Sequence, residues 1–307
     1  NYTGYVYSSS FNYYCITRQN GKATISTFDY KHNKVKEQTY NTSNSQNEYY
    51  VNNGNTTWQA LSGNKIFYLG YRNVSKNSNS SSNKLFLYSL NPDTGDKKIL
   101  PALDENIPSS AQIKSAGNYI YIMYVTGNGT TSSPYKLVAK SYNTINETWN
   151  DAGELEIGTV KFSMNNMNYT NSKFYSWYRN GNTIYHAIYN PNASTNSRWT
   201  FNSCNISVSS SYSFVYVCQN NNKIYYNNRR NIYEYDLTNN TITSKSFSSL
   251  DNYSMSGGFT MGTRTFIYDL DYICEFDYSA GTTPIVYRFN SSQTMRPYLS
   301  NSSYLST

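Results

Sequence analysis

The feature that most constrains the fold is a hairpin-shaped pattern that the chain repeats. "IYEYDLTNNTITSKSF" (232–247) alternates apolar and polar positions on both sides of a polar turn, and "ICEFDYSAGTTPIVYRF" at 273 has the same pattern. Four earlier segments match: "TFDYKHNKVKE", "LYSLNPDTGDKKI", "AKSYNTINETW" and "AIYNPNASTNSRW". Aligning Asp29, Ser89, Ser141, Ile188, Asp236 and Asp277 gives a mean spacing of about 50 residues, which indicates a repeat architecture.

Each hairpin follows two shorter strand-like runs, for example "AQIKSAGN" and "YIYIMYVTG". Units of four strands at this spacing are typical of β-propeller blades, because a lone sheet cannot bury both of its faces. The 35 tyrosines favour strands. The sequence predicts an all-β, six-bladed β-propeller with four antiparallel strands per blade, forming a single domain over 1–307. The blades are expected at 4–42, 57–102, 110–152, 160–204, 211–248 and 253–290, with a C-terminal tail at 291–307. Their innermost strands are expected at 4–10, 58–64, 111–118, 161–168, 213–219 and 255–261.

The ends of the hairpins resemble kelch repeats, which continue from the apolar strand into "Tyr-Asp-x-x-Thr-x-x-Trp". "YNTINETW" ends at Trp149, "YNPNASTNSRW" ends at Trp199, and "YDLTNNT" supplies Tyr235 and Asp236. This resemblance extends over the whole chain. It implies a propeller fold and no particular chemistry.

Sequons for N-glycosylation occur along the whole chain, largely in expected turns, where a glycan is tolerated. They stand at Asn1, Asn41, Asn55, Asn73, Asn79, Asn128, Asn146, Asn168, Asn192, Asn205, Asn239, Asn252, Asn290 and Asn301. The chain begins with Asn1 and contains no apolar run of membrane-spanning length. We therefore expect a processed, secreted, extracellular glycoprotein with no membrane insertion.

Four cysteines fit two disulfides in an oxidising compartment. Cys204 and Cys218 are close in sequence, at the end of one unit and on the next inner strand, and we expect them to pair. Cys15 and Cys274 belong to the first and last units, which a ring brings together, so their bond would fasten the closure. The alternative is four buried free thiols.

The distribution of charged residues and histidines argues against nucleic-acid binding, catalysis and metal binding. The net charge of +7 is scattered, whereas nucleic-acid binding needs a concentrated basic patch. The expected inner strands contain no Asp, Glu or His, which counts against an enzyme acting in the channel. His32 and His186 lie far apart in the repeat and show no metal-ligand spacing. We expect neither catalysis nor a cofactor, with Ca²⁺ as the one weak alternative.

Two groups of carboxylates remain as candidate sites. "YDLDYICEFDY" gathers Asp269, Asp271, Glu275 and Asp277, which are interpreted either as a Ca²⁺ or acid/base site or, more simply, as a charged strand edge. A sparse acidic rim is expected before four inner strands, from Glu48, Asp104, Glu105, Glu154, Glu156 and Asp251.

These observations favour a structural or adhesive protein that assembles into extracellular filaments or a surface coat. Self-association is expected through the chain ends, with Tyr298, Leu299, Tyr304 and Leu305 of the tail adding to the sheet edge of a neighbouring copy. The alternative is a carbohydrate-binding lectin acting through the mouth of the ring, with Trp58 and Trp177 as candidate stacking residues. A hydrolase that uses a rim acid pair is the third possibility.

Overall fold

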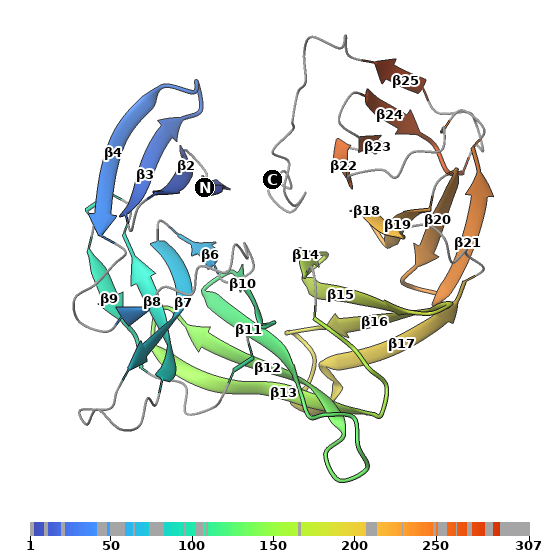
Figure 1. Ribbon diagram of the computed structural model, residues 1–307, viewed down its shortest axis with the longest axis horizontal. Coiled ribbons are helices and arrows are strands. Elements are labelled where there is room, and N and C mark those ends of the chain that lie inside the picture. The colour runs from blue at the N-terminus through green and yellow to red at the C-terminus, as the bar shows by residue number, and fades with distance from the viewer. Residues whose placement is uncertain are drawn as a thin grey trace. The chain divides into compact units, whose positions relative to one another are not determined.

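The computed structural model shows an all-β protein built from antiparallel sheets (Figure 1). It describes residues 3–8, 12–19, 22–41, 48–49, 59–63, 65–73, 83–91, 93–94, 96–101, 107–108, 110–164, 167–206, 214–228, 230–247, 250, 257–261, 263–268, 272–279 and 285–288, in some strands by the backbone alone. Within this part of the chain, no helix is long and apolar enough to cross a membrane.

The described strands form six sheets, numbered here along the chain. Sheet 1 contains β1 (Thr3–Ser8), β2 (Asn12–Gln19), β3 (Lys22–Asp29) and β4 (Lys34–Asn41). Sheet 2 contains β5 (Glu48–Tyr49), β6 (Gln59–Ser62), β7 (Lys65–Asn73), β8 (Asn83–Leu90) and β9 (Lys97–Ile99). Sheet 3 contains β10 (Gln112–Ala116), β11 (Tyr119–Thr126), β12 (Tyr135–Asn143) and β13 (Thr148–Gly158).

The remaining three sheets follow the same plan. Sheet 4 contains β14 (Asn168–Thr170), β15 (Lys173–Asn180), β16 (Thr183–Tyr189) and β17 (Trp199–Asn205), with a short 3-10 turn, η2 (Thr195–Ser197), before β17. Sheet 5 contains β18 (Val215–Asn220), β19 (Lys223–Asn228), β20 (Asn231–Asp236) and β21 (Thr241–Ser246). Sheet 6 contains β22 (Gly257–Met261), β23 (Arg264–Tyr268), β24 (Tyr272–Phe276) and β25 (Ile285–Arg288).

Five of these sheets have four strands in sequence order, as the repeat predicts. Two details differ from the prediction. Sheet 2 has a fifth strand, because β5 and β6 both pair with β7. In sheet 4 the first strand is β14 at 168–170 and not 161–168, since 161–164 is not extended into a ladder. No described sheet closes on itself.

The chain divides into two compact units, each described separately. Unit 1 comprises Asn1–Trp177 and Ala187–Thr200, and unit 2 comprises Tyr178–His186 and Phe201–Thr307. In unit 1, sheets 2 and 3 share a core that includes Phe67, Leu87, Ile113 and Ile122. In unit 2, sheets 5 and 6 share a core that includes Cys218, Ile232, Ile267, Cys274 and Phe276. In each unit these two successive sheets thus bury apolar side chains against each other.

One turn recurs in all six sheets, between the third and fourth strands. It begins with an Asp or Asn whose Oδ1 accepts a hydrogen bond from the backbone N–H two residues later. This is an Asx turn, which reverses the chain through a hydrogen bond within the turn itself. These residues are Asp29, Asn91, Asn143, Asn190, Asp236 and Asp277, with N···O distances of 2.8, 2.9, 2.9, 3.1, 2.8 and 2.9 Å. In sheets 2 to 4 the Asx residue lies two residues after the position aligned from sequence.

Candidate functional site

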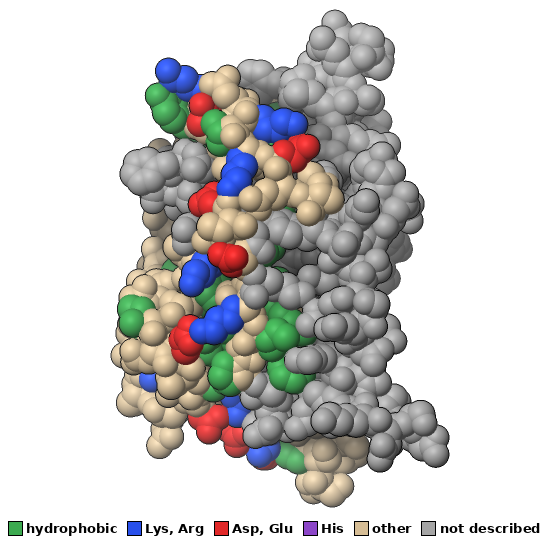
Figure 2. Space-filling model, turned by 90° about the vertical axis from the view of Figure 1, so that its left-hand side faces the viewer, with side chains coloured by type: hydrophobic (Ala, Val, Ile, Leu, Met, Phe, Trp, Pro, Cys, Tyr) green, Lys and Arg blue, Asp and Glu red, His purple; other side chains and the backbone are tan. Residues whose placement is uncertain are grey.

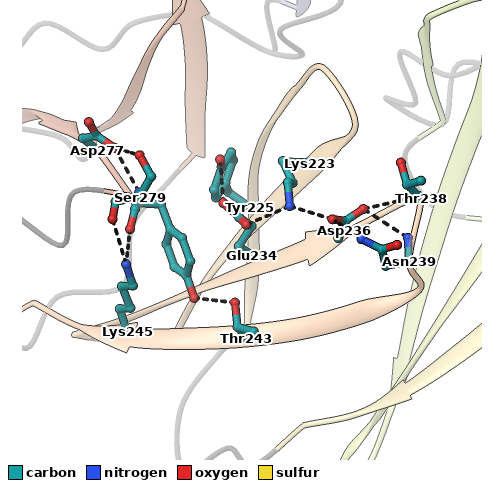
Figure 3. Close-up of polar contacts among 11 residues, drawn as sticks. Lys223, Tyr225, Glu234, Asp236, Thr238, Asn239, Thr243, Lys245, Asp277 and Ser279 are labelled. Atoms are coloured by element: carbon teal, nitrogen blue, oxygen red, sulfur yellow. Dashed lines mark hydrogen bonds and ion pairs between the residues drawn. The ribbon is translucent and has the colours of Figure 1, made fainter.

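A polar cluster lies on one face of sheet 5 (Figure 3). The ladder pairs Tyr225 of β19 with Glu234 of β20, and Glu234 with Thr243 of β21. The neighbouring pair on the same face is Lys223 with Asp236. Directly opposite residues of an antiparallel pair point to the same side, so four chemically different groups meet there.

Lys223 links the two carboxylates of the cluster. Its Nζ lies 2.7 Å from Asp236 Oδ2 and 3.1 Å from Glu234 Oε1. Tyr225 donates a hydrogen bond to Glu234 Oε2 at 2.9 Å. The side chains of both acids are 17% exposed, so water screens these contacts less than it would at a fully open surface.

The contacts shift the ionisation of three groups. The hydrogen bond from Lys223 lowers the pKa of Asp236, and the backbone N–H groups of Thr238 and Asn239 lower it further. The same bond with Asp236 raises the pKa of Lys223. Burial raises the pKa of Tyr225 far above its usual value, and the Glu234 charge adds to this. At neutral pH the cluster therefore holds the Lys223 ammonium, the Asp236 carboxylate and the neutral Tyr225 phenol.

The cluster also fastens sheet 5 to sheet 6, as Figure 3 shows. Tyr278 contacts Thr243 through its hydroxyl at 2.8 Å, and its ring centroid lies 6.0 Å from that of Tyr225. Lys245 donates through Nζ to the backbone carbonyl of Tyr278 and, at 3.3 Å, to that of Ser279. Its ammonium also lies 4.8 Å from the Tyr278 ring centroid, a cation–π distance.

The contacts of this cluster are structural: they hold the strands of sheet 5 together and attach sheet 5 to sheet 6. The Lys223 ammonium occupies the place between the two carboxylates where a bound cation would stand, and each acid also accepts further hydrogen bonds from the protein. Among the described residues, no group of three or more His, Cys, Asp and Glu side chains is arranged to hold a metal ion.

The structure describes the side chains of four of the acidic residues singled out in the sequence: Glu154, Glu156, Glu275 and Asp277. Glu154 and Glu156 lie on β13, the fourth strand of sheet 3, and not in a connection that leads into an inner strand, as was expected. Glu154 pairs with Lys136 at 3.4 Å. Glu275 forms an ion pair with Arg264 on the neighbouring strand. Asp277 accepts hydrogen bonds from Ser279 at the start of its turn. Asp104, Glu105, Asp251, Asp269 and Asp271, and the side chain of Glu48, lie outside the described residues.

The two histidines have unlike environments. His32 is exposed in the β3–β4 turn, with a positive φ of 66°. His186 is 1% exposed, its Nε2 lies 2.7 Å from the Tyr226 hydroxyl, and its ring stacks on Tyr235 with centroids 3.7 Å apart. Burial lowers the pKa of His186 to about 3, so it is neutral, and its Nδ1 has no hydrogen-bond partner. It serves as a core aromatic residue.

The expected Cys204–Cys218 disulfide is not present, since both residues are free and buried. Cys204 on β17 donates to the carbonyl of Asn240 at 3.2 Å, whereas Cys218 on β18 packs in the core between sheets 5 and 6. The two thiols thus lie in different environments despite their proximity in sequence. Burial raises the pKa of both. The side chain of Cys15 lies outside the described residues, so its predicted bond to buried Cys274 stays a prediction.

Three sequon asparagines lie in the Asx turns of successive sheets, two or three residues after the Asx residue. Asn146, Asn192 and Asn239 are all exposed, in sheets 3, 4 and 5. Asn128 and Asn205 are also exposed, and Asn168 is half-buried. The side chains of Asn1, Asn41, Asn55, Asn73, Asn79, Asn252, Asn290 and Asn301 lie outside the described residues, as do Trp58, Tyr298, Leu299, Tyr304 and Leu305.

The tryptophans of the kelch-like motif hold neighbouring sheets together. Trp149 of β13 donates through Nε1 to the carbonyl of Pro101 at 2.8 Å, just after sheet 2. Trp199 of β17 donates to the carbonyl of Gly153 on β13 at 3.1 Å. Each indole thus reaches back to the preceding repeat. Trp177, the other described candidate for sugar stacking, lies half-buried on β15.

The Lys223, Glu234 and Asp236 cluster is the arrangement that sequence reasoning missed. Period-2 spacing in "YEYD" places Glu234 and Asp236 on one face, the same signal that was applied to Asp269 and Asp271. What the sequence does not contain is the strand register that puts Lys223 opposite Asp236.

Comparison with known proteins identifies the fold class. No protein-family model and no curated protein matches the chain. Among solved structures, Sqt1 of Saccharomyces cerevisiae is similar with a TM-score of 0.54 and 9% identity over 90% of this chain and 70% of that one. Dipeptidyl peptidase 4 of Porphyromonas gingivalis is similar with a TM-score of 0.50 and 8% identity over 88% of this chain and 43% of that one. The chain has a β-propeller-like fold. At these identities the likeness concerns the fold alone.

Proposed function

We propose that this chain is a secreted, N-glycosylated, six-bladed kelch-like propeller with a structural or adhesive role and no catalytic activity. One observation carries the proposal: an Asx turn joins the third and fourth strands in each of the six sheets, and in three successive sheets this turn contains an exposed sequon asparagine. A glycan at such a turn meets no steric obstacle, and it shields the outer surface from unspecific contact.

The candidate site supports the non-catalytic part of the proposal. Lys223 contacts both of its acidic side chains, and its remaining groups join sheet 5 to sheet 6. General acid–base chemistry requires a titratable group that can exchange a proton with substrate near neutral pH, and a carboxylate held by an ammonium and backbone N–H groups is poorly suited to this.

Glycan mapping tests the modification and the compartment together. In protein passed through a eukaryotic secretory pathway, we expect glycans at Asn146, Asn192 and Asn239. Thr148→Ala, which removes only the Asn146 sequon, should lower the mass by one glycan and leave the other two sites occupied. An enzymatic deglycosylation that leaves the mass unchanged would contradict both parts of the proposal.

Assembly through the chain ends is tested by deleting residues 294–307. Light scattering is expected to show polymers of the full chain and smaller species of the truncated chain. If both are monomeric at high concentration, the structural-polymer role fails and binding of carbohydrate becomes the function to test, with an array of glycans. A panel of hydrolase substrates, with and without Ca²⁺, tests the absence of catalysis.

A further inference from the structure

Strand β21 is an outer edge of sheet 5 (Figure 1), and one side of its backbone faces no described strand. The N–H of Phe247 donates to the carbonyl of Arg230 at 2.8 Å, which marks that pair as hydrogen-bonded. Hydrogen-bonded pairs alternate along an antiparallel ladder, so the pairs that follow are 232 with 245, 234 with 243 and 236 with 241. The N–H and C=O groups of Ile242, Ser244 and Ser246 therefore point away from the sheet.

Other outer strands carry charged side chains, which discourage pairing with another chain. On β13, Asp151 and Glu154 form ion pairs with Lys140 and Lys136, and their side chains are 85% and 63% exposed. On β4, Lys34 pairs with Glu37. On the side of the molecule drawn in Figure 2, basic and acidic side chains alternate. An approaching strand would have to accommodate these groups.

Strand β21, "TITSKS", lacks this protection. Thr241, Thr243, Ser244 and Ser246 are exposed, and all are uncharged. Its one charged residue, Lys245, is directed to the Tyr278 and Ser279 carbonyls of sheet 6. The other uncharged outer strand with described side chains, β17, ends at the exposed sequon asparagine Asn205, whereas the sequon asparagine next to β21, Asn239, lies in the turn before the strand.

We propose that β21 pairs antiparallel with β21 of a second copy of this chain, about a two-fold axis at Ser244. This register sets Ser244 opposite Ser244 and Ile242 opposite Ser246, which brings together the residues whose backbone groups point outward. It opposes Lys245 to Thr243, so no two like charges meet. Such an interface is isologous and closes as a dimer, and it does not require the chain ends.

Single-cysteine variants test the register. Ser244→Cys should form a disulfide-linked dimer under mild oxidation, because the two copies of residue 244 are direct neighbours. Ile242→Cys alone should not form a disulfide-linked dimer, because residue 242 of one copy faces residue 246 of the other and the two copies of residue 242 are four positions apart. A mixture of Ile242→Cys and Ser246→Cys chains should cross-link, and the unsubstituted chain, whose Cys204 and Cys218 are buried, is the background control.

Variants that block the edge test the interface itself. Ser244→Pro removes an outward N–H without affecting a ladder bond, and Ser244→Lys opposes two ammonium groups; both should raise the dimer dissociation constant at least tenfold, while Ser244→Thr should leave it unchanged. Circular dichroism checks that each variant is folded, and Ser244→Lys suffices if Ser244→Pro does not fold.

The inference would be overturned by an unsubstituted chain that stays monomeric, by a Ser244→Lys chain that still dimerises, or by self-cross-linking of Ile242→Cys alone. Loss of the dimer on deletion of 294–307 would also overturn it, and would assign the contact to the tail. Dimers that survive that deletion but not Ser244→Lys would separate this interface from tail-mediated assembly.

Discussion

Lys114 on β10 is a lysine with no described carboxylate to neutralise it. Burial lowers its pKa to about 8, well below the usual value for lysine. The folded state therefore binds the proton less tightly than the unfolded state, so stability should rise as pH increases from about 8 towards 10.5.

Replacing Lys114 by Met tests this effect. The variant should gain on the order of 1–3 kcal/mol in the free energy of unfolding at pH 7 and lose the rise above pH 8. Urea unfolding at several pH values measures both, with Lys65→Met, at an exposed position, as the matched control. An unchanged pH dependence in Lys114→Met would show that the lysine is fully hydrated.

Asp236 gives a pH dependence of the same sign as Lys114, but in the acidic range. The pKa of Asp236 is lowered in the folded state. Its contribution to the free energy of unfolding is therefore present above the unfolded-state pKa of 3.8 and is lost as pH falls towards the folded-state pKa. Asp236→Asn should be less stable than the unsubstituted chain at pH 7, by about 1–2 kcal/mol. The difference should shrink as pH falls below 4. A difference that stays constant down to pH 2 would exclude the ion pair as its cause.

Among the strands, β13 shows how one irregularity joins two repeats. Its ladder with β12 shifts register so that Ala139 pairs with Gly153 while Lys140 pairs with Asp151, which leaves Ala152 as the extra residue of a bulge. The Ala152 carbonyl accepts hydrogen bonds from Tyr189 at 2.7 Å and from Arg198 at 3.2 Å. The bulge thus presents carbonyl groups to the side chains of sheet 4.

Gly153 makes this bulge possible, because its φ is 113°, a conformation that L side chains rarely adopt. A Cβ atom there would also lie 3.0 Å from the Thr195 carbonyl oxygen. Gly153→Ala should lower the free energy of unfolding by about 1–3 kcal/mol. Gly158→Ala, with a φ of 68° but no atom near the added Cβ, isolates the backbone strain from the steric contact. If both variants lose the same free energy of unfolding, the contact between the added Cβ and the Thr195 carbonyl oxygen makes no contribution.

At the scale of the whole molecule, stability should come from the apolar layers between successive sheets. Leu87 is fully buried between sheets 2 and 3, so Leu87→Ala should cost about 2–5 kcal/mol. Ile145, which is 68% exposed in a turn, provides the contrast: Ile145→Ala should change stability by less than about 0.5 kcal/mol. Similar losses at both positions, measured by chemical unfolding, would contradict this packing.

The sequence by itself determined the strands, the turns and the repeat. Alternation and polar turn residues are local signals, so the hairpins and the Asx turns at Asp29, Asp236 and Asp277 lie where the pattern predicts them. Local signals were not sufficient in sheet 4. The run at 161–168 has strand-like residues, but only 168–170 pairs with the neighbouring strand β15.

Contacts between strands and sheets were decided only by the tertiary structure. The register of β19 on β20 sets Lys223 against Asp236, and the packing of sheets directs Cys204 to Asn240 while Cys218 joins a different core. Proximity in sequence favoured a bond between those two cysteines, but a side chain's direction depends on which face of which sheet it occupies. Pairings of this kind depend on residues far apart in the chain, and a local pattern carries no information about them.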